Sequence, residues 1–284
     1  MFSSRTSTPD ATRDLGRGDA PSSGRVGPAT SAPAAWRVGL TALIDLLLPP
    51  FCAVCDAVLC DGRRDPLCGA CWLKVERVTP PLCVICGLEL GRFRTSPTPT
   101  VAPPPGARCG PCRTRPPAFT YARSAARYDD VVREALHAFK FRGRRALATP
   151  LADLIAETGL ASLPVAAPDL LIPVPLFPGR ERARGFNQAA LLARRMGRAW
   201  GVPVDLDVLA RAIDTQAQTE LTGRERRQNV RGAFRVRRPE TVAGRHVIVV
   251  DDILTTGSTA GACALALRRA GAATVGVLTV ARAG

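Results

Sequence analysis

Four Cys-x-x-Cys pairs stand close together in the first half of this 284-residue chain. The pairs are Cys52/Cys55, Cys68/Cys71, Cys83/Cys86 and Cys109/Cys112. Each such turn presents two thiolates to one ion, and zinc takes four soft ligands in tetrahedral geometry. The spacing therefore predicts two zinc ribbons, one made by the earlier two pairs and a second, with a longer loop, by the later two. A cross-braced pairing of the same residues stays open.

Because cysteine fills all eight positions, no coordination site is left open, and the predicted zinc ions are structural rather than catalytic. Glycines at 69, 87 and 110 follow a cysteine in three of the turns. We expect them to take positive φ and leave backbone N–H groups free to point at sulfur. Of the two remaining cysteines, Cys263 reads as a core residue of a helix, and no role is assigned to Cys60.

The composition changes along the chain and predicts four regions. Residues 1–35 are rich in Ser, Pro, Gly and Ala without a hydrophobic period, so we expect a disordered tail. Residues 36–50 have leucines at helical spacing and end in two prolines, which is typical of a short amphipathic helix. Residues 51–118 hold the cysteine pairs. Residues 119–284 alternate helical patterns with β-rich runs.

That alternation predicts an α/β fold, a mostly parallel sheet flanked by helices. The expected strands are Leu170–Pro175, Val204–Arg211, His246–Asp252 and Thr274–Ala281. The expected helices are Asp129–Phe141, Ala146–Glu157, Asn187–Trp200 and Ser258–Ala270.

The formal net charge of +15 is unevenly distributed. Between Leu176 and Arg245 there are 15 arginines and 7 acidic residues, a concentration that favours a polyanionic partner, either a phosphorylated small molecule or nucleic acid. The longest apolar run, Val38–Leu48, contains Asp45 and falls short of the ~20 residues of a bilayer span, so no integral membrane segment is expected. The N-terminus has no apolar signal region, and the reduced-cysteine pattern favours the cytoplasm.

The most specific stretch is a buried-strand pattern, Val247–Val250, followed by Asp251 and Asp252 and then a hydroxyl-rich turn that opens a helix. Ligands of open α/β sheets bind at the carboxyl ends of the strands, and a helix N-terminus favours phosphate. We therefore expect the two aspartates to accept hydrogen bonds from ribose hydroxyls. The expected phosphate-binding residues are Thr255, Thr256, Gly257, Ser258 and Thr259.

Two arginine-rich segments precede this stretch. Arg180, Arg182 and Arg184 lie in an expected basic loop, where their forked guanidiniums suit pyrophosphate; a solvated loop is the alternative. Gln218, Arg226 and Asn229 belong to a polar insertion that is long enough to form a lid. Lys140 is either a phosphate contact or a surface lysine.

The stretch from Val247 to Thr259 resembles the 5-phosphoribosyl-1-pyrophosphate (PRPP) signature of type I phosphoribosyltransferases. The resemblance implies that fold for residues 119–284. It also implies ribose 5-phosphate on residues 255–259, ribose hydroxyls on Asp251 and Asp252, and Mg²⁺ bound together with PRPP. Pyrophosphate would leave C1 and a nitrogen nucleophile would arrive.

The order of the parts, with the Arg-Gly-Phe-Asn-Gln box at 184–188, is similar to the ComF (ComFC) family of competence-associated proteins. That resemblance covers about residues 36–284 and implies a cytoplasmic protein that handles single-stranded DNA with the DNA-uptake machinery. The long insertion between Cys86 and Cys109 departs from the family pattern. A metabolic transferase with an unidentified nitrogen acceptor and a non-catalytic PRPP sensor are the alternative functions.

Overall fold

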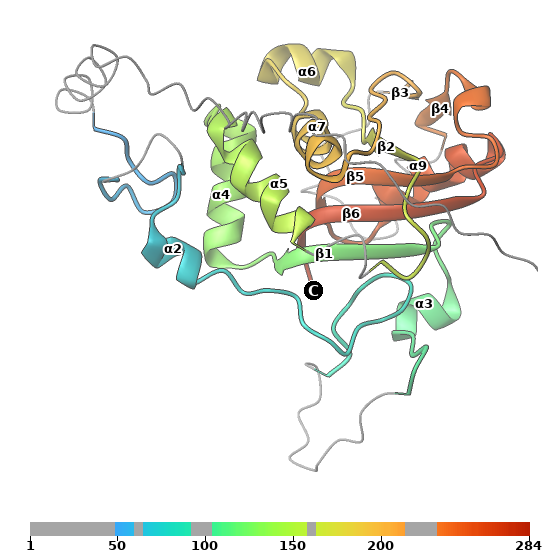
Figure 1. The fold of residues 1–284 in the computed structure, drawn as a ribbon, viewed down its shortest axis with the longest axis horizontal. Coiled ribbons are helices and arrows are strands. Elements are labelled where there is room, and N and C mark those ends of the chain that lie inside the picture. The colour runs from blue at the N-terminus through green and yellow to red at the C-terminus, as the bar shows by residue number, and fades with distance from the viewer. Residues whose placement is uncertain (1–48, 60–64, 92–103, 158–162, 214–231) are drawn as a thin grey trace, which may run out of the picture. The chain divides into compact units, whose positions relative to one another are not determined.

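The computed structural model describes residues 49–59, 65–91, 104–157, 163–213 and 232–284 (Figure 1). Within this chain, residues 48–284 form one compact unit. The expected tail and nearly all of the expected amphipathic helix lie outside the described residues. Among the helices in the described ranges, none combines the length and hydropathy required to cross a bilayer.

A parallel four-stranded sheet organises the second half of the chain. Its strands are β1 (Tyr121–Arg127), β6 (Thr274–Arg282), β5 (His246–Leu254) and β2 (Leu170–Pro173), in that spatial order (Figure 1). β5 and β6 lie in the centre and consist largely of fully buried aliphatic residues, because helices cover both of their faces.

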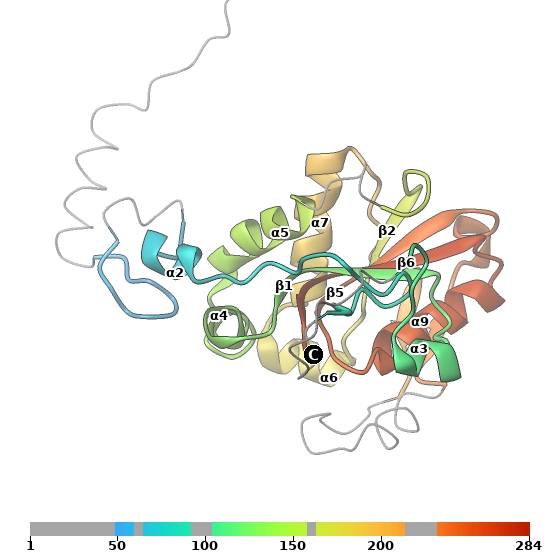
Figure 2. The same cartoon turned by 90° about the horizontal axis from the view of Figure 1, so that it is seen from below.

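The two faces follow from the alternation of side chains along each strand. Ile248 and Val250 of β5 belong to a hydrophobic cluster with α4 (Asp130–Phe141) and α5 (Ala148–Ala156). Val247 and Val249 belong to the opposite cluster, with α9 (Ser258–Arg269). Figure 2 shows α5 and α7 (Gln188–Trp200) on one face of the sheet and α9 on the other. The predicted fold class is confirmed.

The four expected helices form within about two residues of their predicted bounds. A short 3₁₀ turn, Arg145–Leu147, leads into α5, and another, Pro239–Thr241, precedes β5. The α9 helix buries Cys263 completely, so the expectation of a core cysteine is confirmed.

The expected strand Val204–Arg211 is only partly correct. β3 spans Leu209–Arg211 and pairs antiparallel with β4 (Phe234–Val236), outside the main sheet. The Oδ1 atom of Asp205 accepts hydrogen bonds from the amides of Asp207 and Val208 at 2.9 and 3.1 Å. This side-chain turn diverts the backbone before a continuous strand can form.

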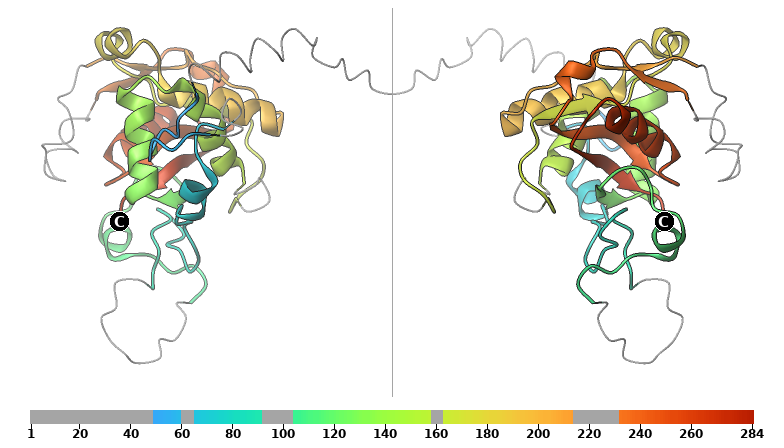
Figure 3. Two further views of the ribbon diagram at one scale, coloured as in Figure 1. Left: turned by 90° about the vertical axis from the view of Figure 1, so that its left-hand side faces the viewer. Right: turned by 90° about the vertical axis from the view of Figure 1, so that its right-hand side faces the viewer.

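The edge strand β1 was not identified from the sequence, and chain from the cysteine region covers its free side. The amide of Val78 donates to the carbonyl of Ala125 at 3.1 Å, and the amide of Ala122 donates to the carbonyl of Ile85 at 2.6 Å. Segment 76–91 and α3 (Gly110–Thr114) lie beyond β1, away from β6 (Figures 1 and 3). These contacts protect an edge that otherwise presents unpaired backbone groups.

Candidate functional site

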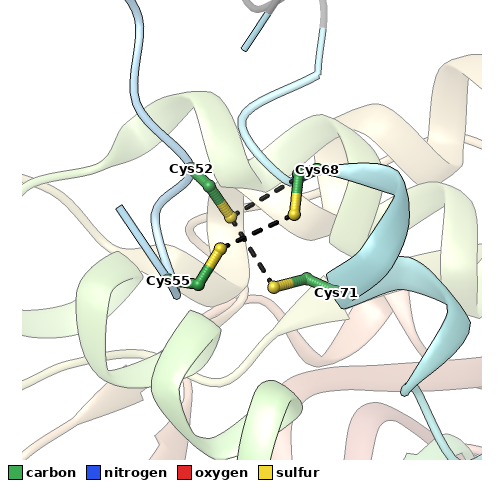
Figure 4. A group of neighbouring side chains, drawn as sticks. All are labelled: Cys52, Cys55, Cys68 and Cys71. Carbon is green, nitrogen blue, oxygen red and sulfur yellow. Dashed lines mark hydrogen bonds between the residues drawn. The ribbon is translucent and has the colours of Figure 1, made fainter. Parts of the chain in front are cut away.

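The first four-cysteine cluster consists of Cys52, Cys55, Cys68 and Cys71, whose sulfurs point toward one another in Figure 4. The Sγ atoms of Cys52 and Cys71 are 3.8 Å apart, and those of Cys55 and Cys68 are 3.6 Å apart. Zn–S bonds of about 2.3 Å in a regular tetrahedron place sulfurs about 3.8 Å apart. The amide of Cys68 also donates to the Cys52 sulfur at 3.4 Å. The arrangement fits one zinc ion.

The second four-cysteine cluster consists of Cys83, Cys86, Cys109 and Cys112. The Sγ atoms of Cys86 and Cys109 are 3.6 Å apart, and all four residues are buried, whereas Cys55 of the first cluster is exposed. Within each cluster the four sulfurs lie within 4.8 Å of one another. The sequential pairing predicted from the spacing therefore holds, and the cross-braced alternative does not.

The turns within the clusters differ from the expectation for their glycines. Gly87 has φ +67°, and a Cβ there would lie 2.6 Å from the Ala122 carbonyl oxygen, so only glycine fits. Asp56 holds the matching position of the first cluster with φ 55°. Gly69 and Gly110 instead begin the short helices α2 (Gly69–Leu73) and α3, and their predicted positive φ is wrong.

A pocket of about 400 Å³ opens at the carboxyl end of β5. Asp251 and Asp252 line it together with the β5–α9 turn (residues 255–259), of which Thr255, Gly257, Ser258 and Thr259 are lining residues. Gly257 has φ +74° and caps α9, and the Thr256 and Ser258 hydroxyls are 2.7 Å apart. The first turn of α9 has N–H groups without intrahelical partners, which suits an anion.

Asp252 is 4% exposed and makes two side-chain contacts. The Nζ atom of Lys140 lies 2.7 Å from its Oδ2 atom, and the Nε2 atom of Gln188 donates to the same oxygen at 3.4 Å. Lys140 is thus a mostly buried partner of Asp252, and its alternative interpretation as a surface lysine is wrong. The ion pair holds the Asp252 carboxylate at the pocket wall.

Asp251 is electrostatically different from its neighbour. Its Oδ1 atom accepts a hydrogen bond from the Asp252 amide at 2.9 Å. Desolvation, followed by the negative charge of Asp252, raises the pKa of Asp251 to about 8. The pocket therefore contains one carboxylate paired with a cation and one that readily takes up a proton near neutral pH.

The arginines expected in a basic loop lie on a short helix, α6 (Pro178–Arg184), and the loop prediction is wrong. Proline at its start presets helical φ. Arg184 lies near the pocket, its Cζ atom 5.3 Å from the ring centroid of Phe141, and burial lowers its pKa while the charge of Asp252 opposes that shift. Arg182 is exposed, and Arg180 is half-buried.

The Arg-Gly-Phe-Asn-Gln box forms the junction between α6 and α7. Gly185 ends α6 with φ +79°, Phe186 is buried in the core, and Asn187 caps α7 through its Oδ1 atom at 3.0 Å from the Ala189 amide. The Nη1 atom of Arg184 and the Oε1 atom of Gln188 are buried without a hydrogen-bond partner in the described part of the chain. Unsatisfied buried polar atoms around Asp252 suit a polar ligand.

The α4 wall of the pocket was largely missed by sequence reasoning. His137 and Phe141 of α4 line the pocket together with Tyr128, which precedes the helix, and the ring centroids of His137 and Phe141 are 4.9 Å apart. Phe141 is 65% exposed at the end of α4, a feature that only the structure reveals. The expected lid residues Gln218, Arg226 and Asn229 lie outside the described residues.

Family comparisons agree with this architecture. Residues 43–113 match the model of the double zinc ribbon domain, and residues 182–284 match that of the phosphoribosyl transferase domain. The fold and the cysteine clusters thus define a protein with a double zinc ribbon and a phosphoribosyltransferase domain.

Sequence similarity to curated proteins identifies the family within this class. The chain is 33% identical over 240 residues to DNA utilization protein YhgH of Salmonella typhi, covering 84% of this chain and 99% of the relative. It is 28% identical over 224 residues to competence protein F of Haemophilus influenzae (78% and 92% coverage). Its identity to competence protein ComFC of Bacillus subtilis is 28% over 228 residues (77% and 85%). The chain belongs to the ComF family.

Proposed function

We propose that the pocket at the end of β5 binds PRPP, with its 5-phosphate on the β5–α9 turn. The observation that carries the proposal is the meeting of that turn with Asp251 and Asp252 in one pocket. The start of α9 supplies amide donors, and the hydroxyls of Thr255, Thr256, Ser258 and Thr259 supply more. Gly257 lets the backbone approach a phosphate closely because it has no Cβ.

The paired aspartates are suited to the ribose. Their carboxylate oxygens accept hydrogen bonds from vicinal hydroxyls, and Lys140 fixes the orientation of Asp252 through its 2.7 Å contact. Carboxylates at the edge of a pocket are also the ligands that Mg²⁺ prefers, so the residues fit a magnesium ion bound with PRPP. Bound there, magnesium would neutralise charge on the leaving pyrophosphate.

Arg184 is the strongest candidate for a pyrophosphate contact. Its Nη1 atom is buried without a partner among the described residues, and the guanidinium lies near Asp252. Arg180 lies one helical turn earlier and on the same side of α6, whereas Arg182 lies on the opposite, exposed side. We therefore assign pyrophosphate to Arg184 with support from Arg180, and give Arg182 a smaller part.

Calorimetric titration with PRPP and Mg²⁺ tests the site. Asp252→Asn removes the charge next to the sugar, so we expect affinity to fall at least about tenfold. Asp153→Asn is the matched control, because Asp153 also pairs with a basic side chain, Arg195 at 2.9 Å, but lies exposed on α5. Unchanged affinity in Asp252→Asn would overturn the assignment.

Phosphoribosyl transfer is the activity that this pocket supports best. The ring pair of His137 and Phe141 gives it an aromatic wall on which a planar nitrogen acceptor can stack. Release of pyrophosphate in the presence of candidate acceptors distinguishes a transferase from a PRPP sensor. If the protein binds PRPP but releases no pyrophosphate with any heteroaromatic amine or base, it is a PRPP sensor and not a transferase.

A role in handling single-stranded DNA, together with the uptake machinery, is the second part of the proposal. The names of the relatives, DNA utilization protein and competence protein, support it, as does the net charge of +15. Basic grooves bind single strands with strong salt dependence. Binding of a labelled oligonucleotide should weaken steeply as salt rises, and binding that ignores salt would contradict this role.

A further inference from the structure

Arg282, the last residue of β6, contacts the backbone at the start of the β5–α9 turn. Its Nη1 atom donates to the carbonyl of Leu254 at 2.9 Å and to the carbonyl of Thr255. These two carbonyls are the point at which the chain leaves the strand and enters the turn. The guanidinium therefore fixes the direction in which the turn begins.

The other end of the same guanidinium reaches the second four-cysteine cluster. The Nη2 atom lies 3.9 Å from the sulfur of Cys86. A cavity of about 100 Å³ borders Arg282, three cysteines of that cluster, and Thr256 and Gly257 of the turn. The ring of Phe119 also lies next to the turn: a Cβ added to Gly257 would be 3.5 Å from it. The cluster and the turn thus share one packed interface.

The first cluster has a different environment. Cys52 and Cys71 pack with Leu59 and Leu67 in the hydrophobic cluster that contains α4 and α5. The cysteines of the second cluster belong to the opposite hydrophobic cluster, together with Leu254 and Phe119. The β5–α9 turn therefore borders the second cluster.

A zinc ion with four thiolates carries a net negative charge, and hydrogen bonds to ligand sulfurs from neighbouring groups orient the ligands. A guanidinium is well suited to such a double contact because its planar fork donates in several fixed directions at once. With zinc bound, the cluster is a rigid anionic partner that holds one side of the Arg282 fork, while the other side holds the two carbonyls.

We propose that Arg282 is a positioning residue that couples zinc in the second cluster to the phosphate affinity of the β5–α9 turn. The inference rests on the proposed function of that turn. It separates the two ribbons by role: the second supports the ligand site directly, and the first supports the fold.

Titration with ribose 5-phosphate and measurement of zinc content test the coupling. In Arg282→Met we expect about tenfold weaker binding with zinc content unchanged, since both contacts of the fork are lost. Arg282→Lys should bind nearly as weakly, because an ammonium lacks the fork. Arg123→Met is the matched control: Arg123 donates to the carbonyls of Ala122 and Val84 beside the same cluster, and not to the turn. Its affinity should equal that of the wild type.

A double-mutant cycle completes the test. Cys86→Ser should weaken ribose 5-phosphate binding in the wild type and add no further loss in Arg282→Met, whereas Cys55→Ser should leave binding unchanged. If Cys86→Ser does not fold, the Arg282 and Arg123 variants decide. Wild-type affinity in Arg282→Met, or additive losses in the cycle, overturns the coupling. A wild-type protein that does not bind ribose 5-phosphate contradicts the proposed function instead.

Discussion

The two four-cysteine clusters are built alike and placed differently. In each, the first cysteine donates its amide to a carbonyl five residues on: Cys52 to Ala57 at 2.8 Å and Cys83 to Leu88 at 2.7 Å. In each, the second pair of cysteines lies at the start of a five-residue helix, α2 or α3. The local sequence therefore specifies the same metal-binding framework twice.

The two four-cysteine clusters differ in their surroundings. Cys55 leaves one edge of the first cluster exposed, whereas the second cluster is wholly buried, is hydrogen-bonded to β1 and contacts Arg282. Neighbouring residues, rather than the ligand motif, thus determine what each cluster contributes.

The largest difference should appear when one zinc site is removed. Cys83→Ser deprives the second cluster of a fully buried ligand and opens the edge of the sheet, so we expect a loss of about 5 kcal/mol or more in the free energy of unfolding. Cys55→Ser should cost clearly less. Urea unfolding with zinc analysis measures both. Equal losses in the free energy of unfolding would mean that the two clusters contribute equally to stability, contrary to this comparison.

The ion pair of Lys140 and Asp252 should stabilise the pocket side of the β5–α9 turn without affecting zinc binding by the clusters. Lys140→Gln leaves Asp252 buried without its ion-pair partner, which costs about 3–5 kcal/mol. Arg195→Gln, in the exposed pair with Asp153, should cost about 0–1 kcal/mol. Both variants should keep about two zinc ions. Loss of zinc in Lys140→Gln would show that the pocket and the cluster cannot be separated.

The two regions should also respond to pH in opposite directions. Acid protonates thiolates and releases zinc. Asp251 acts the other way, because its pKa rises from 3.8 to about 8 on folding. Between these values the folded state holds a proton that the unfolded state lacks, so the free energy of unfolding falls as pH rises, by up to ~1.4 kcal/mol per pH unit.

Asp251→Asn should flatten this slope. Unfolding curves of the zinc-loaded wild type and variant, measured from pH 5 to 8, give the difference directly. If the free energy of unfolding changes with pH at the same rate in both proteins, Asp251 is not the source of the pH dependence.

The smallest effect concerns the glycines that begin α2 and α3. A Cβ meets no atom within 4 Å at either position. Gly69→Ala should therefore stabilise the protein by about 0.5 kcal/mol. Gly110→Ala should give no such gain, because Pro111 follows it and disfavours helical φ and ψ for a residue with a Cβ. Thermal unfolding resolves the pair, and an equal gain in both would contradict the argument.

The features that the sequence predicted best are those with a local cause. Cysteine spacing identified both clusters, and the run Val247–Val250 identified the central strand. Both features are determined by residues that are close together in the sequence. Two of the features that the sequence did not predict depend on contacts between distant residues. The partner of Lys140 is on another element, and the role of Arg282 requires β5, β6 and the cysteine region together. The break before β3 depends on one turn-forming side chain, Asp205.

A crystal structure of the chain with PRPP and Mg²⁺ tests the central claim most directly. The account predicts the 5-phosphate at the amides of residues 256–259 and the ribose hydroxyls at Asp251 and Asp252, in the pocket beside Lys140. PRPP bound instead in the cavity of about 660 Å³ on the other side of the turn, lined by Pro117, Ala262 and Leu265, would contradict it.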